Sequence, residues 1–170
     1  MRRSLERHPD SRCEGVQGLA VEASRDGSGR LSLRYVLTGK VGALAIPATG
    51  AVRRADRLWE HTCFEAFVAE PGQGYLEFNF APSGQWAAYR FDGYRRGMAP
   101  LQIAAPRIEL EKGEDGLELC VSLRVSEPRP LRLGLTAVIE EVGGRLSYWA
   151  LAHPPGPPDF HDAAGFALPL

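Results

Sequence analysis

The segment 117–125 alternates apolar and polar residues more regularly than any other part of the chain, and this alternation restricts it to a β-strand. Leucine or valine occupies every second position, and polar residues such as Glu118 and Ser122 stand between them. Successive side chains of a strand point to opposite faces of a sheet, so a period of two indicates a strand with one buried face. The segment 31–38 repeats the pattern and predicts a second half-buried strand.

Similar short runs follow one another along the chain, separated by Gly, Pro and charged residues, as in the turn expected at 127–130. About nine or ten such runs with almost no helix predict an all-β protein, an antiparallel sandwich or barrel, and of the two we expect a jelly-roll-like β-sandwich. The best candidate for one short helix is 51–60, where Val52, Ala55 and Trp59 have near-helical spacing. Because helices of that length are marginal, a single turn or a loop is an equal alternative.

A length of 170 residues fits one domain with a single hydrophobic core. Residues 1–14 are polar, so we expect a flexible N-terminal segment followed by one β-sandwich domain over residues 15–170. The sequence PPGPPD at 154–159 has the composition of a linker, but only eleven residues follow it. We therefore expect a rigid crossing segment that ends in a docked tail.

Charge and cysteine content exclude several classes of protein. A net charge of −1 gives no reason to expect nucleic acid or an anionic membrane as a partner, and no apolar run approaches the roughly 20 residues that span a bilayer. The N-terminus lacks the apolar segment of a signal peptide. Cys13, Cys63 and Cys120 form neither a CxxC pair nor a complete disulfide framework. We therefore expect free thiols and a cytoplasmic protein, with the oligomeric state left open.

The segment 58–97 gathers aromatic residues among carboxylates and arginines, in three alternating runs separated by Pro-Gly-Gln-Gly and Pro-Ser-Gly. These turns predict an antiparallel meander of three strands. Aligning the apolar positions of the runs assigns these residues to the core face: Phe64, Ala66 and Val68; Leu76, Phe78 and Phe80; Ala87, Tyr89 and Phe91. The opposite face then carries Glu65, Glu77, Asn79, Trp86 and Arg90.

This second face offers the chemistry that a sugar requires. Carboxylates accept hydrogen bonds, the Asn79 amide both donates and accepts them, and the Arg90 guanidinium donates two in parallel. The flat Trp86 ring suits the C–H side of a sugar. A solvent-facing sheet surface with cross-strand Glu–Arg pairs would use similar residues, so that alternative stays open for the charges. An exposed tryptophan instead favours a ligand or a partner.

The order LW-x5-E-x-F, then YLEFNFAPSGQW, then YR-x-D resembles the superfamily of DOMON domains and family 9 carbohydrate-binding modules. Within it, the chain is most similar to the bacterial DOMON-like proteins. The resemblance is strongest over 58–97 and continues over 133–141 and 147–168. It implies a β-sandwich in which an aromatic clamp and a strand carboxylate grip a terminal sugar.

The resemblance also implies roles for single residues. By position in the motif, Trp59 is similar to a clamp ring and Glu65 to the strand carboxylate. Arg90 is similar in position to an arginine of the sugar-binding members. Trp149 and Phe160 are both candidates for the second ring of the clamp.

Two other sites remain as alternatives. Some members of the superfamily bind haem b through a Met and a His, which here would be Met98 and His153. A metal-dependent hydrolase could instead use His61, His153, Asp159 and His161, although the H-x7-H spacing matches no common metal motif. We favour structural histidines and expect no bound metal. Asp159 and His161 would then hold the tail over the sheet as one wall, or lid, of the pocket.

Little in the sequence indicates an enzyme. Ser83 lies in a Pro-Ser-Gly turn rather than a G-x-S-x-G elbow, and any two glutamates on adjacent strands could match the spacing of a glycosidase pair. We therefore predict a non-catalytic domain that binds a carbohydrate or a similar small polar ligand, with a protein-interaction domain as a further alternative. The predicted binding residues are Trp59, Glu65, Glu77, Asn79, Trp86, Arg90, Trp149, His153, Asp159, Phe160 and His161.

Overall fold

The computed structural model describes residues 1–126 and 130–170, so the turn predicted at 127–130 lies outside the described residues except for Pro130. This part of the chain contains thirteen β-strands and three short 3-10 helices. The strands are β1 (Arg2–Arg7), β2 (Val16–Arg25), β3 (Arg30–Gly39), β4 (Arg53–Arg54), β5 (Cys63–Ala69), β6 (Tyr75–Phe80), β7 (Gln85–Phe91), β8 (Ala99–Pro100), β9 (Arg107–Lys112), β10 (Gly116–Arg124), β11 (Arg132–Glu140), β12 (Leu146–Ala150) and β13 (Leu168–Pro169). The 3-10 helices are η1 (Val41–Ala43), η2 (Leu58–Glu60) and η3 (Ala163–Gly165).

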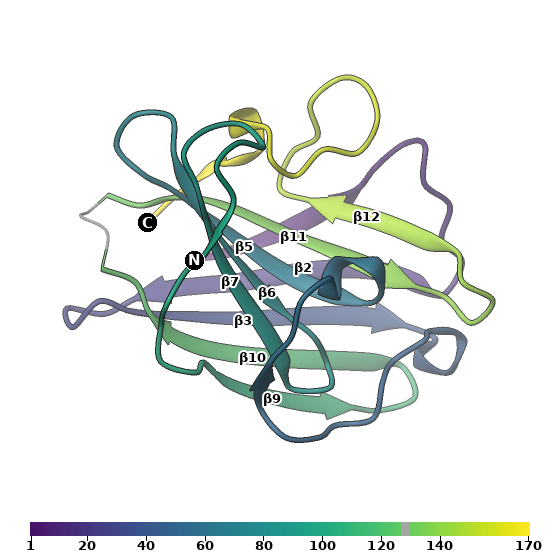
Figure 1. The fold of residues 1–170 in the computed structure, drawn as a ribbon. Coiled ribbons are helices and arrows are strands. Elements are labelled where there is room, and N and C mark those ends of the chain that lie inside the picture. The colour runs from purple at the N-terminus through teal and green to yellow at the C-terminus, as the bar shows by residue number, and fades with distance from the viewer. Residues whose placement is uncertain (127–129) are drawn as a thin grey trace.

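The strands form one continuous sheet that curls back on itself (Figure 1). Its order is β4-β7-β6-β5-β11-β12-β1-β2-β3-β10-β9, with β13 beside β11 and β8 beside β7. The prediction of a mostly β protein is confirmed, and the described residues contain no α-helix. Because β4 runs parallel to β7, the sheet is mixed and not purely antiparallel as expected, and its strands belong to one curled sheet. None of the helices in residues 1–126 and 130–170 is long and apolar enough to cross a membrane.

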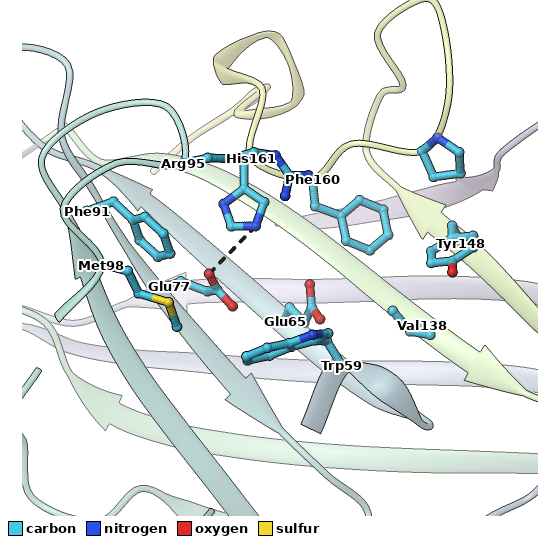
Figure 2. Close-up of a pocket in the computed structure, with 11 residues that line it drawn as sticks. Trp59, Glu65, Glu77, Phe91, Arg95, Met98, Val138, Tyr148, Phe160 and His161 are labelled. Atoms are coloured by element: carbon cyan, nitrogen blue, oxygen red, sulfur yellow. Dashed lines mark ion pairs between the residues drawn. The ribbon is translucent and has the colours of Figure 1, made fainter. Parts of the chain in front are cut away.

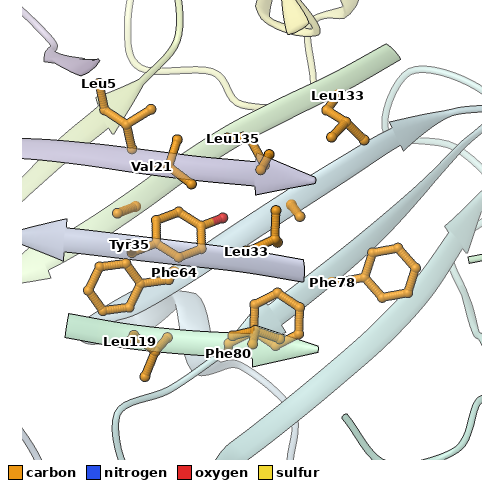
Figure 3. Close-up of a cluster of buried hydrophobic side chains, with 14 of the residues drawn as sticks. Leu5, Val21, Leu33, Tyr35, Phe64, Phe78, Phe80, Leu119, Leu133 and Leu135 are labelled. Carbon is orange, nitrogen blue, oxygen red and sulfur yellow. The ribbon is translucent and has the colours of Figure 1, made fainter. Parts of the chain in front are cut away.

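The curled sheet has two arms, β4-β7-β6-β5-β11-β12 and β2-β3-β10-β9, whose apolar faces pack together as the main core (Figure 3). The alternation in β3 and β10 places Tyr35 and Leu119 in this core, where neither is exposed. The Tyr35 ring lies 5.1 Å from that of Phe64, and its hydroxyl donates to the backbone oxygen of Glu65 at 2.7 Å. Each such buried side chain contributes about 1.5–3 kcal/mol.

The expectation of a flexible segment at 1–14 is wrong for residues 2–7, which form β1. This strand pairs with β2 on one side and β12 on the other, and so joins the two arms. Leu5 faces Leu19 across the pairing and is only 4% exposed. The remaining side chains of β1 are exposed, which explains why its sequence is polar. Pairing with strands that are distant in sequence, rather than its own pattern, holds it in place.

The segment 51–60 forms no α-helix but contains β4 and η2. Arg57 has a left-handed backbone conformation, with φ of 61°, which interrupts any helix at that point. Arg54 is held by the sheet instead, because its guanidinium lies 5.1 Å from the Trp86 ring and donates to the backbone oxygen of Leu101 at 2.9 Å. These contacts fix the approach of the chain to η2.

The tail behaves as the proline-rich sequence predicts. After the crossing segment 154–159, the chain passes through η3 and ends in β13, which pairs with β11 so that Leu168 faces Leu133. Phe166 is buried next to this pairing, at 3% exposure. The docked tail therefore anchors the loop that precedes it over the outer face of the first arm (Figure 1).

Candidate functional site

The outer face of the first arm, opposite the main core, carries a pocket of about 400 Å³ (Figure 2). That volume lies within the range of about 300–1,000 Å³ usual for small-ligand sites. The strands supply its floor: Glu65 from β5, Glu77 from β6, Phe91 from β7, Val138 from β11 and Tyr148 from β12. The walls come from η2, from the loop between β7 and β8, and from the C-terminal loop: Trp59, Arg95, Met98, Pro158, Phe160 and His161.

Strand alternation brings the two glutamates together on this face, as the sequence predicts. Their neighbours Phe64 and Phe78 point into the main core, which turns Glu65 and Glu77 outward. Glu65 faces Asn79 across the pairing of β5 and β6, so Glu77 lies on the adjacent diagonal. Diagonal neighbours on paired strands are close enough for their side chains to interact.

Both carboxyl groups are buried, at 2% exposure for Glu65 and 4% for Glu77. The Thr136 hydroxyl donates to Glu65 Oε2 at 3.0 Å, and the Asn79 amide donates to Glu77 Oε1 at 2.7 Å. Asn79 is itself fully buried, so it positions Glu77 and does not line the pocket. Within the described part of the chain, hydrogen bonds occupy only one oxygen of each carboxyl group.

Burial gives this pair unusual acidity. Loss of solvent, followed by the charge of Glu77, raises the pKa of Glu65 to about 8, against the hydrogen bond from Thr136. Loss of solvent likewise raises the pKa of Glu77 to about 7, against Asn79 and the charge of Arg95. The two groups titrate as a pair and together hold a proton near neutral pH. They can therefore both donate and accept hydrogen bonds within the pocket.

His161 stands over the pair from the C-terminal loop. Burial, and then the charge of Arg95, lowers the pKa of His161 to about 4, against the opposing effect of Asp159, so the ring is neutral at pH 7. The Tyr75 hydroxyl accepts the backbone N–H of Arg95 at 3.2 Å and lies 2.7 Å from His161 Nδ1, to which we assign its proton. The ring proton then resides on Nε2, 4.0 Å from Glu77 Oε2.

Asp159 ties the two loops of the wall together. It accepts hydrogen bonds from the Arg95 guanidinium at 2.9 Å, from the Tyr94 hydroxyl at 2.5 Å and from the backbone N–H of His161 at 3.0 Å. Arg95 has a left-handed backbone, with φ of 51°, at the turn that directs its side chain toward Asp159. Asp159 thus lies behind the pocket and acts by holding Arg95 and His161.

Two aromatic rings flank the carboxyl groups. Figure 2 shows the Trp59 indole on one side of Glu65 and the Phe160 ring on the other. The centre of the Phe160 ring lies 6.0 Å from that of Tyr148, a residue that was not among the predicted binding residues. Of the two predicted candidates for a second ring, Phe160 lines the pocket, whereas Trp149 is 6% exposed and belongs to the main core.

The predicted positions of Trp86 and Arg90 are wrong. On β7 the faces are reversed, so that Trp86 faces Phe80 and packs in the main core, while Phe91 lines the pocket. Arg90 lies outside the pocket, where its guanidinium pairs with Glu70 at 2.9 Å. Because β7 is apolar on both faces, alternation alone could not decide between them, and the register with β6 does.

The histidines of the alternative sites are not brought together. His153 Nε2 donates to the backbone oxygen of Glu6 at 2.8 Å, outside the pocket that Met98 lines, so the expected haem pair is not assembled. His61 Nδ1 lies 2.8 Å from Glu140, away from the C-terminal loop. Among residues 1–126 and 130–170, no group of three or more His, Cys, Asp or Glu could hold a metal ion.

Several lining residues escaped the sequence analysis, in particular Phe91, Arg95, Val138, Tyr148 and Pro158. Tyr148 carried an ambiguous signal, because it and Trp149 must face opposite sides of a strand, and the sequence placed Trp149 rather than Tyr148 in the pocket. Arg95 and Pro158 carried none, since both lie in loops without periodicity.

The fold is similar to that of two solved structures. One is a candidate carbohydrate-binding protein from Bacteroides uniformis ATCC 8492, with 14% identity and a TM-score of 0.67 over 98% of this chain and 84% of that chain. Another is a family 9 carbohydrate-binding module from Caldicellulosiruptor kristjanssonii in complex with glucose, with 10% identity and a TM-score of 0.50 over 89% and 76%. No family model and no curated protein sequence matches the chain significantly. At these identities the likeness establishes the fold, which this chain shares with both structures.

Proposed function

We propose that the protein binds a carbohydrate, without catalysis, in the pocket between Trp59 and Phe160. The observation that carries this proposal is the pair of buried carboxyl groups, Glu65 and Glu77, between two aromatic walls in a pocket of about 400 Å³. A sugar ring presents C–H groups on its faces and hydroxyl groups around its edge. The rings would pack on the faces while the floor binds the edge.

The floor is suited to hydroxyl groups because each hydroxyl both donates and accepts. The pair Glu65–Glu77 holds a proton near pH 7, and the Nε2–H of His161 supplies a further donor. Hydrogen bonds made in such a buried site are stronger than in water, because the local dielectric is low. Phe91 and Tyr148 extend the apolar surface around this polar centre.

The two structures of the same fold support the proposal, since one is a candidate carbohydrate-binding protein and the other is a module in complex with glucose. We extend the proposal to kinship with the DOMON-like proteins, on the sequence motifs of 58–97. A cytoplasmic location also remains a proposal, based on three free cysteines, Cys13, Cys63 and Cys120.

Calorimetric titration with a panel of mono- and disaccharides tests the function. We expect Trp59→Ala and Glu65→Ala to weaken binding at least ~10-fold each, because they remove a wall and a hydrogen-bonding group. Arg90→Ala and Glu111→Gln are the controls and should leave the affinity unchanged, since both residues are exposed and outside the pocket. No binding of any sugar, or equal binding by all four variants, would refute the proposal.

A further inference from the structure

The ionisable groups of the pocket are unbalanced in charge. Glu65 and Glu77 contribute two carboxyl groups, against the single guanidinium of Arg95 and the neutral ring of His161. Arg95 is already paired with Asp159, at 2.9 Å, so it does not balance the two buried glutamates. The two carboxyl groups of the floor therefore have no cationic partner among the described residues, and they could bind one positively charged group.

The positions of the two glutamates specify where that charge belongs. Both are more than nine-tenths buried, and both line the pocket with one carboxyl oxygen that no hydrogen bond among the described residues occupies. Glu77 and Glu65 come from neighbouring strands, and Figure 2 shows their carboxyl groups directed into the same space. A carboxylate buried without a cation is costly, so a bound cation between them would gain more than one at the surface.

The aromatic walls favour the same kind of group. Trp59 lies beside the carboxyl groups, and an ammonium within about 6 Å of a tryptophan ring is attracted to its face. Phe160 and Tyr148 line the opposite side with further ring surface. Aromatic rings next to carboxylates therefore suit an organic cation better than they suit a neutral polyol.

We propose that the pocket selects carbohydrates that carry a primary amine, with the ammonium group held between Glu65 and Glu77 beside Trp59. This inference rests on the proposed function and specifies its substrate class. The ammonium replaces the proton that the empty pair holds, so binding of the amine releases a proton to solvent near pH 7. The raised pKa values of both glutamates support this exchange, because a neighbouring cation would lower them again.

The test compares three matched sugars by calorimetry at pH 7: D-glucosamine, N-acetyl-D-glucosamine and D-glucose. The acetyl group removes the charge but keeps the ring hydroxyls, and glucose replaces the amine with a hydroxyl. We expect D-glucosamine to bind at least ~10-fold more tightly than either of the others. Because the position of the amine is not specified, 6-amino-6-deoxy-D-glucose is tested in parallel, and either amine can meet this criterion.

Proton release is measured by repeating the titration in two buffers of different ionisation enthalpy. The preferred amine should release between a half and one proton, and glucose close to none. In Glu77→Gln, whose fold is checked by circular dichroism, the preference for the amine should fall below ~3-fold. If this variant fails to fold, the comparison of ligands in the unaltered protein still decides the question.

The possible outcomes separate the two proposals. Glucose binding as tightly as both amines would overturn the amine inference and leave carbohydrate binding standing. Binding of an amine without proton release would also overturn it, because the exchange at Glu65 and Glu77 would be absent. If none of the sugars binds, the proposed function fails, and the amine inference fails with it.

Discussion

Replacing Glu65 with glutamine should stabilise the protein at alkaline pH while it impairs the pocket. In the unfolded chain this carboxyl group ionises with its ordinary pKa of 4.5, whereas in the folded protein burial raises the pKa to about 8. The folded state therefore keeps a proton that the unfolded chain releases between those values. The associated stability is fully present below pH 4.5 and is lost as pH rises toward 8. Glutamine does not ionise, so Glu65→Gln removes this loss.

The size of the effect follows from the two pKa values. The interval from 4.5 to about 8 corresponds to on the order of 5 kcal/mol at pH 8.5. Coupling to Glu77 and the added N–H donors of the amide reduce this, and we expect about 3 kcal/mol to be measured. For a domain of this length that corresponds to a rise of about 10 °C in Tm. At pH 4 the carboxyl group is protonated in both states, so the difference should nearly vanish.

Urea unfolding at pH 4 and pH 8.5, followed by circular dichroism, measures both differences. Because each variant is compared with the unaltered protein at the same pH, the titration of other groups such as His161 cancels to a first approximation. Glu111→Gln, at an exposed position on β9, is the matched control and should change stability by less than ~0.5 kcal/mol at either pH. A stability difference for Glu65→Gln that is the same at both pH values would refute the reasoning.

Three other substitutions test the architecture around the site. Asp159→Ala removes the acceptor that joins the two wall loops, so we expect ~10-fold weaker ligand binding and faster amide hydrogen exchange over residues 92–98, measured by mass spectrometry. Leu5→Ala should cost about 2–5 kcal/mol in urea unfolding because β1 closes the core, and an exposed neighbour, Ser4→Ala, should cost almost nothing; equal costs would mean that β1 is not packed as described. Gly134→Ala should cost about 1–3 kcal/mol, since its new Cβ would lie 2.6 Å from the Phe166 ring, and an unchanged unfolding midpoint would contradict that packing.

The two carboxyl groups of the pocket floor were predictable from the sequence, whereas the apolar residues of the floor were not. On β5 and β6 one face is apolar and the other carries polar residues, so alternation placed Glu65 and Glu77 on the outer face correctly. On β7 both faces are apolar, and the same method reversed Trp86 and Phe91. Which face of β7 is buried depends on its register with β6, and that register is set by the turn between them and by the packing of the other arm.

The walls were only partly predictable. Trp59 and Phe160 were identified through the family resemblance, but nothing in the sequence near Arg95 indicated that it lies beside His161. Arg95 and Asp159 are 64 residues apart, and their loops meet only because β13 docks the tail against β11. Contacts between loops depend on where the strands that carry them lie in the fold, and local sequence patterns do not predict that placement.

The sequence by itself determined that the chain is mostly β and that two glutamates share one face of paired strands. It did so because side-chain alternation is a local property, readable in any run of five or six residues. Only the tertiary structure decided that 2–7 is the strand joining the two arms and how completely the expected lid buries the two glutamates. Burial under the C-terminal loop raises the pKa of Glu65 and Glu77 and turns a polar sheet surface into a site that requires a ligand or a proton. Burial of that kind depends on chain segments far apart in sequence.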